Sequence, residues 1–286
     1  MISLIVCSID DRLYEGFERS VAATIGVAYE IVRVDNRIEN KDLAAVYNKG
    51  AALAKYDHLL FVHEDVTFHT NNWGQILLQY FNDLPKPGII GIMGSDYISY
   101  VANGWYVRDQ SRIFAHLVQR YKYVKKEEVA INIHSQSVKP VFTVDGVFMA
   151  VKKEVWEKHR FDENVKGFHG YDLSFSLNVS ATHQNYFVPG ITITHFSEGK
   201  FDAQWFRNNL SIRERLFPSL TYLREKNQLQ PAIERLLFFE SLQNINRLDI
   251  SKKEKQALRK EYIKWAKQWL GTPRLWFELL KLRLIG

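Results

Sequence analysis

The chain has 286 residues, of which 46% are hydrophobic and 24% are charged, as is ordinary for a soluble globular protein. This length allows one large α/β domain with an appendage, or two small domains. The single cysteine, Cys7, excludes an internal disulfide framework and a cysteine-based zinc site, and it fits a reducing compartment.

The N-terminal residues 1–6 are apolar, but they lack the basic start and the cleavage site of a signal peptide, so we interpret them as a first strand. No apolar run approaches the ~20 residues of a membrane-spanning helix. We therefore expect a cytoplasmic protein.

The first 65 residues alternate between buried strands and amphipathic helices. The expected strands cover residues 2–8, 29–34 and 59–62, and the expected helices cover residues 11–23 and 42–53. This strand-helix-strand-helix-strand order favours a parallel sheet with right-handed crossovers.

The rest of the chain continues the α/β pattern up to about residue 200. The further elements that we expect are a helix at 72–82, a strand at 89–93, surface loops with an antiparallel excursion at 97–139, a strand at 141–151, a helix at 152–159, a helix from Asp172, and a strand at 186–195. Residues from 202 onward are predicted to be helical. The sequence thus predicts an α/β fold with a mostly parallel sheet flanked by helices, and two domains, 1–205 and 206–286.

One apolar strand ends in two adjacent carboxylates. Residues 59–62 are followed by His63, Glu64 and Asp65. Adjacent carboxylates repel each other, and a divalent cation shared with a diphosphate would neutralise them. Mg²⁺ and Mn²⁺ both accept such oxygen ligands. The alternative is an exposed loop with two solvated acids.

Polar side chains stand at five predicted strand ends or adjacent turns. They are Ser8, Asp35, Asp65, Asp172 and His195. Because the carboxyl ends of parallel strands meet at one edge, these side chains can converge on a ligand. The sequence has no G-x-G-x-x-G fingerprint after the first strand, no P-loop and no G-x-S-x-G elbow, which argues against classical dinucleotide enzymes, P-loop nucleotidases and α/β-hydrolases.

Four places carry a resemblance to a known family. They are Val34-Asp35-Asn36-Arg37, the helical residues 44–50, His63-Glu64-Asp65, and the segments 144–150, 161–163 and 170–177. Their order and spacing resemble family 2-like glycosyltransferases with the GT-A fold over about residues 1–200. The resemblance implies an inverting, hexosyltransferase-like enzyme. It would move a sugar from a UDP- or GDP-sugar donor to a hydroxyl of a glycan or lipid-linked acceptor, in the assembly of surface polysaccharide or glycolipid.

The resemblance also implies roles for named residues. The residues expected to bind the nucleotide-sugar are Ser8, Asp35, Asn36, Arg37, Asn48, Glu64 and Gly146. The family's Asp-x-Asp motif is altered here, since His63 stands at its first acid. Asp65 is then the first metal ligand and Glu64 the second, with His195 as a further ligand, for Mn²⁺ or Mg²⁺. A partly buried structural histidine is the alternative for His195.

The family's acidic pair that supplies the catalytic base is also altered. Alignment places Gly170 on one acid and Asp172 on the other, so Asp172 is the expected base and His169 the alternate. In direct displacement, the base removes the proton of the acceptor hydroxyl as that hydroxyl attacks. The alternative for Asp172 is a helix N-cap.

The C-terminal segment 251–286 is basic and aromatic. It holds ten Lys and Arg residues and three Glu, so its net charge is +7. The whole chain has a net charge of +6, so the other residues together carry about −1. Trp265 and Trp269 lie four residues apart, on one helical face. This pattern indicates peripheral contact with an anionic membrane; a helix packed on the core and a homodimer interface are the alternatives. Because the remainder is close to neutral, we expect no nucleic-acid partner.

Two rival functions stay open at this point. A non-catalytic nucleotide- or sugar-binding module could keep the fold with an altered Asp-x-Asp motif. A nucleotidyltransferase would need a glycine-rich, basic loop after the first strand, which residues 7–12 do not supply.

Overall fold

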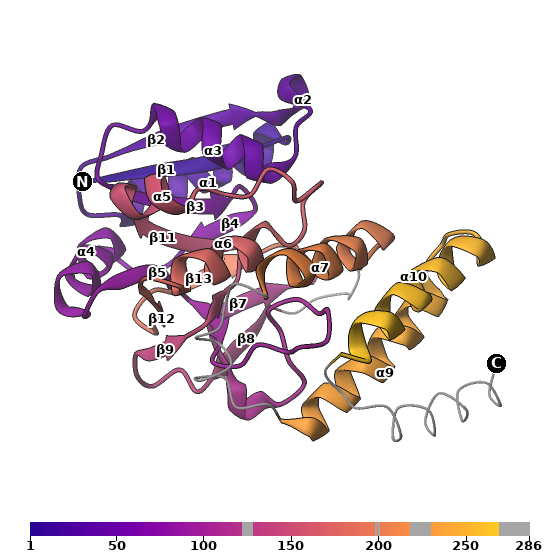
Figure 1. The fold of residues 1–286 in the computed structure, drawn as a ribbon. Helices are drawn as coiled ribbons and strands as arrows, with labels where there is room; N and C mark the ends of the chain where they lie inside the picture. Colours follow the sequence, from indigo (N-terminus) through magenta and orange to yellow (C-terminus); the bar gives the residue numbers. More distant parts are fainter. Residues whose placement is uncertain (122–127, 198, 200, 218–229, 269–286) are drawn as a thin grey trace.

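The structure is a computed structural model that describes residues 1–121, 128–197, 199, 201–217 and 230–268. A seven-stranded sheet forms its centre (Figure 1). In spatial order its strands are β2 (Tyr29–Asp35), β1 (Ile2–Ser8), β3 (His58–His63), β11 (Phe148–Lys152), β5 (Pro87–Gly91), β12 (Gln184–Phe187) and β9 (Lys139–Val141). The first three strands are parallel and join through helices, as predicted.

Five of the seven strands of the central sheet, β2, β1, β3, β5 and β12, run in the same direction, so the mostly parallel sheet that the sequence predicted is confirmed. β11 lies antiparallel between β3 and β5, and β9 lies antiparallel to β12.

A second sheet packs beside the first. Its strands are, in order, β10 (Thr143–Val144), β6 (Met93–Ser95), β7 (Ile113–Arg120), β13 (Ile193–His195) and β4 (Val66–Phe68), with β8 (Glu128–Ile133) on the other side of β7. β7 is antiparallel to both β6 and β8, so the antiparallel excursion expected within residues 97–139 is confirmed.

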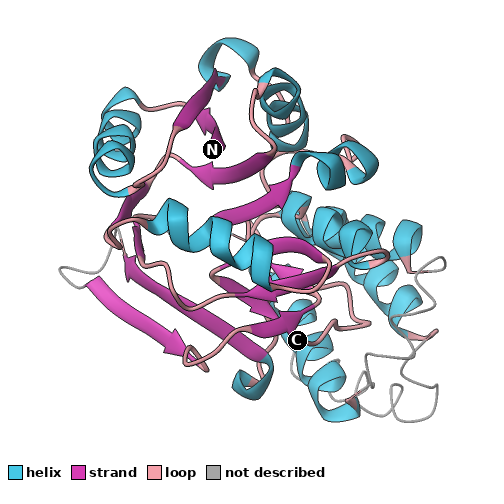
Figure 2. Ribbon diagram, turned by 90° about the vertical axis from the view of Figure 1, so that its left-hand side faces the viewer, coloured by secondary structure: helices cyan, strands magenta, loops and turns pink. Residues whose placement is uncertain are grey.

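Helices cover both faces of the central sheet (Figure 2). α1 (Asp11–Thr24) and α4 (Trp73–Asp83) bury their apolar sides on one face, against residues such as Leu4 and Leu60. α3 (Leu43–Leu53), α5 (Lys153–His159) and α6 (Tyr171–Ser180) cover the other face, against residues such as Ile5 and Phe61. A short helix, α2 (Asn36–Glu39), follows β2 and was not predicted.

A third apolar core joins the C-terminal helices to the α/β body. α7 (Ala203–Leu216), α9 (Pro231–Arg247) and α10 (Lys252–Ala266) pack with residues of the segment 97–113, and α9 and α10 lie side by side at the end of the molecule far from β2 (Figure 1). The Trp265 indole N–H donates to the Tyr100 carbonyl at 2.7 Å, and the Tyr262 hydroxyl donates to the Ala102 carbonyl at 2.7 Å.

The alternative of a helix packed on the core is therefore observed for Tyr262 and Trp265. Trp269 and the residues after it, on which the predicted membrane contact also rests, lie outside the described part of the chain. The boundary expected at residues 205 and 206 falls inside α7, and the division into two domains stays a prediction. Among the described residues, no helix is both long and apolar enough to cross a bilayer.

Candidate functional site

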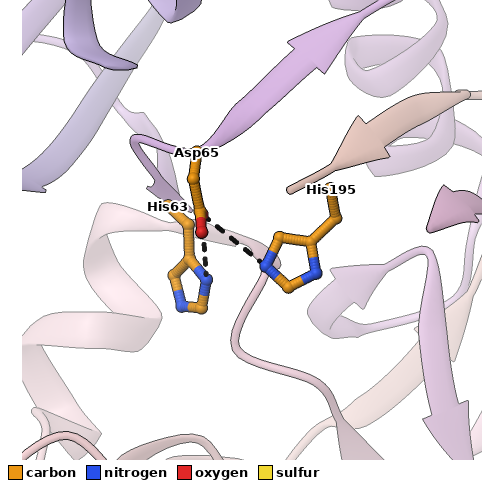
Figure 3. A group of neighbouring side chains, drawn as sticks. All are labelled: His63, Asp65 and His195. Carbon is orange, nitrogen blue, oxygen red and sulfur yellow. Dashed lines mark ion pairs between the residues drawn. The ribbon is translucent and has the colours of Figure 1, made fainter. Parts of the chain in front are cut away.

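His63, Asp65 and His195 come together at the carboxyl end of β3 (Figure 3). His63 ends β3, Asp65 lies in the connection to β4, and His195 ends β13, which pairs with β4. Asp65 Oδ1 lies 3.8 Å from His63 Nδ1 and 3.6 Å from His195 Nε2. One ligand atom of each residue lies within 4.8 Å of the others, so the three side chains can hold one ion.

Hydrogen bonds orient both imidazole rings. Gln119 donates its amide to the backbone carbonyl of His195 at 3.1 Å, which leaves Gln119 Oε1 as an acceptor 3.2 Å from His195 Nδ1. A proton on Nδ1 then turns the Nε2 lone pair of His195 toward Asp65. His63 Nε2 lies 2.8 Å from the Tyr171 hydroxyl, and donation to that oxygen leaves the His63 Nδ1 lone pair facing Asp65.

The donor set fits a first-row divalent ion. Two imidazole nitrogens and one carboxylate oxygen suit Mn²⁺ and its neighbours in the series, whereas Mg²⁺ prefers oxygen ligands alone. His63 was not among the residues that the sequence predicted to bind metal. Its place at the first acid of the altered Asp-x-Asp motif was the available signal, since imidazole is itself a common ligand.

The side chain of Glu64 makes different contacts from those of His63 and Asp65. Its side chain is 7% exposed, and Oε1 accepts hydrogen bonds from the backbone N–H groups of Ile9 at 2.8 Å and Asp10 at 3.1 Å. Glu64 lies in the bend between β3 and β4, and its carboxylate turns to the start of α1, whereas Asp65 turns to His63 and His195. Glu64, expected at the nucleotide-sugar and as the second metal ligand, thus holds the connection between β1 and α1 and is not part of the three-residue cluster.

Asp172 lies in the first turn of α6, one residue after Tyr171. The N-cap of α6 is Gly170 with a φ of 82°, so the alternative that Asp172 is the N-cap is wrong. Burial of the carboxyl group, helped by the negative charge of Asp145, raises the pKa of Asp172 to about 7. A carboxylate of that basicity can accept a proton at neutral pH.

Gly146 allows the Tyr171 side chain to lie directly against the backbone of the turn before β11. A Cβ at Gly146 would lie 2.0 Å from the Tyr171 hydroxyl, the group that contacts His63. Any side chain here would displace Tyr171. This explains a glycine at a position where the resemblance implied nucleotide-sugar contact.

His169 lies two residues before the helix and is partly buried. Burial lowers the pKa of its imidazole, and the charge of Asp202 opposes that effect. Its backbone carbonyl accepts from Asn208 of α7 at 2.8 Å.

Three of the residues expected at the nucleotide lie together at the ends of β1 and β2. Ser8 and Asp35 are paired across these strands, and Asp35 accepts from Arg37 Nε at 2.9 Å. Arg33 Nε donates to Ser8 Oγ at 3.0 Å, and the Arg37 guanidinium holds the pKa of Asp35 below its usual range. Asp11, which bonds to Arg33 and Arg37, joins this network and was not predicted.

The side-chain amides of Asn36 and Asn48 form hydrogen bonds with backbone groups. Asn36 is 5% exposed and exchanges hydrogen bonds with the backbone of Lys41 at 3.0 and 3.1 Å. Asn48 donates to the Phe161 carbonyl at 2.9 Å and accepts from the Phe161 N–H at 3.0 Å, which ties α3 to the segment after α5.

Strand register brings most of these groups to one edge. His63 pairs with Cys7 beside Ser8, which pairs with Asp35, while Tyr171 connects His63 to the turn that carries Asp172. Comparison with known families now decides the class of protein. A profile described as "Glycosyltransferase like family" matches residues 3–207. The chain belongs to this family.

Solved structures of glycosyltransferases are similar to this chain, and GalNAc-T7 shares its GT-A fold. One is the crystal structure of GalNAc-T7 with UDP, GalNAc and Mn²⁺, at 11% identity and a TM-score of 0.52, covering 94% of this chain and 56% of that one. Another is TarS residues 1–349 from S. aureus, at 11% identity and a TM-score of 0.48, covering 95% and 73%. This chain thus spans little more than half of the GalNAc-T7 chain. No curated protein matches it.

Proposed function

We propose that this glycosyltransferase is an inverting, metal-dependent enzyme that moves a sugar from a nucleotide-sugar to a hydroxyl acceptor. His63, Asp65 and His195 would hold a divalent ion, for which Mn²⁺ is the first candidate. The bound ion would neutralise the negative charge that grows on the departing diphosphate. UDP is the first nucleotide to test, because the similar GalNAc-T7 structure contains UDP and Mn²⁺.

One observation carries this proposal. The Tyr171 hydroxyl lies 2.8 Å from His63 Nε2, and Tyr171 is followed by Asp172 in the first turn of α6. A group that holds the diphosphate and a group that takes a proton therefore belong to the same small region. Displacement at an anomeric carbon needs both, one on each side of the sugar.

Asp172 is the proposed base. Its raised pKa lets the carboxylate take the proton of the acceptor hydroxyl near neutral pH, while the hydroxyl oxygen bonds to the anomeric carbon and the bond from that carbon to the diphosphate breaks. Attack from the side opposite the leaving group inverts the carbon. The leaving diphosphate keeps its electron pair, so one basic carboxylate suffices.

The wider setting is part of the same proposal. A glycan or lipid-linked acceptor, in surface polysaccharide or glycolipid assembly at the cytoplasmic side of a membrane, agrees with the basic segment 251–286.

Turnover of UDP-sugars with Mn²⁺ tests the proposal. For the wild type we expect measurable hydrolysis or transfer, with an inverted product detected by NMR, and for Asp172→Asn a loss of roughly 10²–10⁴-fold with retained binding of UDP. Equal rates in both proteins would remove Asp172 from its role. UDP binding without any turnover would instead favour a non-catalytic binding module.

A further inference from the structure

A rigid loop holds an aromatic ring in solvent close to the proposed base. Phe168 is 52% exposed and lies four residues before Asp172. It stands between Gly167 and Gly170, whose φ values are 71° and 82°. Residues other than glycine rarely adopt such positive φ values. A single exposed apolar side chain is common on a protein surface, so its position is informative only where the backbone around it is held in place.

This backbone is not free to move. Gly167 donates its N–H to Asp42 Oδ1 at 2.7 Å and accepts from the Leu43 N–H at 3.0 Å. On the other side of Phe168, the Asn208 amide donates to the carbonyls of Lys166 at 2.6 Å and His169 at 2.8 Å. The loop is thus tied to the start of α3 and to α7, and the exposed position of Phe168 is built into the fold.

A second exposed ring stands at the beginning of α7, the helix beside α6 (Figure 1). Phe201 is 58% exposed, and its ring packs edge-on against Trp205 with the centroids 4.9 Å apart. Trp205 is backed by the buried ring of Phe206 and by Gly104, where a Cβ would come within 3.2 Å of the indole. This support holds Phe201 in place.

Polar groups lie where the loop that carries Phe168 meets the start of α7. A Cβ placed on Gly167 would lie 3.8 Å from Cγ of Gln204. The negative charge of Asp202 acts on the imidazole of His169 and raises its pKa, against the effect of burial. The Asp202 side chain also accepts from the Trp205 N–H at 2.7 Å, which fixes the start of α7. Two exposed rings and three polar side chains are therefore held at one rim, where the loop that precedes Asp172 meets the start of α7.

We propose that Phe168 and Phe201, with His169, Asp202 and Gln204 at the same rim, form an acceptor subsite that binds a pyranose ring, so that the acceptor is a saccharide. This inference rests on the proposed function, because it uses the position of Asp172 as the base. The C–H groups of a pyranose face carry partial positive charge and pack on the negative face of an aromatic ring. The hydroxyl groups at the edge of the sugar need the polar partners that lie at this rim of the protein.

The mixture of groups favours a sugar over a lipid chain as the part of the acceptor that is recognised. An alkyl or prenyl chain would leave His169, Asp202 and Gln204 without partners when it excluded water, which costs free energy for each buried polar group. A continuous apolar groove would suit a lipid; the rim described here is not continuous.

Binding of methyl hexopyranosides of the gluco, galacto and 2-acetamido series, measured by saturation-transfer NMR, tests the subsite. We expect at least one of these glycosides to bind the wild type, and Phe168→Ala and Phe201→Ala each to weaken that binding by about tenfold. Phe168→Trp should retain it, whereas Phe168→Leu, which is apolar but not aromatic, should lose it. Leu236→Ala is the matched control, because Leu236 is also 52% exposed but lies on α9.

The outcomes separate this proposal from the proposed function. The thermal shift by UDP with Mn²⁺ should be equal in the wild type and all these variants, which also shows that each is folded. If no glycoside binds, or if Phe168→Ala binds as tightly as the wild type, the subsite is refuted while the nucleotide shift stands. If dodecyl phosphate binds the wild type and Phe168→Leu alike while no glycoside does, the rim recognises lipid and the proposal is overturned. Loss of the nucleotide shift in the wild type with retained glycoside binding would contradict the proposed function alone.

Discussion

The carboxyl group of Asp172 is half-buried, and Asp145 places a second negative charge near it. Both effects favour the protonated form, so the pKa is raised to about 7. The unfolded chain releases this proton near the usual value of 3.8, so the fold loses stability as the pH rises from 3.8 toward 7. The same rise in pKa makes the Asp172 carboxylate a base that is strong enough to act at neutral pH.

The pH dependence of turnover follows from this pKa. Since only the deprotonated carboxylate can take a proton, we expect kcat/KM to rise with pH and to level off above about pH 7. Asp145→Asn removes the repulsion, so the midpoint of the rise should move to lower pH. A midpoint that stays unchanged in Asp145→Asn would show that Asp145 does not tune the base.

Tyr171 is the residue through which the metal cluster and the base are connected. Tyr171→Phe removes the hydroxyl that orients His63, so we expect the affinity for Mn²⁺, measured by titration calorimetry, to fall by roughly 10- to 100-fold. Tyr186→Phe is the matched control, because it removes a hydroxyl that bonds to the Pro85 carbonyl at 3.0 Å, away from the site. Equal Mn²⁺ affinities in the two variants would argue against the orienting role.

The location of a residue at the end of a predicted strand was a better guide to the candidate site than its amino-acid type. The sequence marked Asp65, Asp172 and His195 as groups at strand ends or adjacent turns. The structure brings Asp65 and His195 together, and Asp172 follows Tyr171, which contacts His63. The contact between Tyr171 and His63 depends on the packing of α6 against β3, which no local pattern encodes. The bracing contacts of Glu64 and Asn48 are of the same kind, since their partners lie 55 and 113 residues away in sequence.

At the scale of elements, hydrophobic periodicity predicted β1 to β3, α1, α3 and α4 to within one or two residues. It did not predict β7, the longest of the described strands, and the strands expected at 141–151 and 186–195 are each divided in the structure. β1 and α3, for example, follow the expected ranges closely. The strands β4, β6, β10 and β13 have two or three residues each, too few for a period to be seen, and they exist because of their pairing partners. The antiparallel direction of β11 was not predicted, because the residues of a strand do not encode its direction within a sheet.

Glu64 tests whether the connection between β1 and α1 depends on the strand beside it. Glu64→Ala leaves the N–H groups of Ile9 and Asp10 without their acceptor, so we expect the free energy of unfolding in urea to fall by about 1–3 kcal/mol. Glu64→Gln, which keeps an acceptor oxygen, should lose less. The affinity for Mn²⁺ should stay unchanged in both, and a large loss of affinity would instead place Glu64 among the metal ligands.

At the scale of the whole molecule, the C-terminal helices complete the core and are not a loose appendage. Leu258, Tyr262 and Trp265 of α10 are nearly fully buried, against the segment 97–102 and α7. The exposed side of α10 carries lysines, among them Lys260, Lys264 and Lys267. The basic and aromatic residues that the sequence grouped together thus face opposite ways, the rings inward and the charges outward.

Trp265→Ala measures how far α10 belongs to the fold. Because the indole is 5% exposed and its N–H is bonded to Tyr100, we expect a loss of about 3–5 kcal/mol in the free energy of unfolding. Lys264→Ala, on the exposed side of the same helix, should change that free energy by less than about 0.5 kcal/mol. If both variants were as stable as the wild type, α10 would not be part of the cooperative unit.

The central claim is that His63, Asp65 and His195 bind a divalent ion against which a nucleotide diphosphate is held. The most direct test is the thermal shift produced by UDP with and without Mn²⁺ in the wild type and in Asp65→Ala. We predict a clear stabilisation of the wild type by UDP that requires Mn²⁺ and that is absent in Asp65→Ala, because only a ligand bound to the folded state raises the melting temperature. The same stabilisation without Mn²⁺, or its persistence in Asp65→Ala, would contradict the claim.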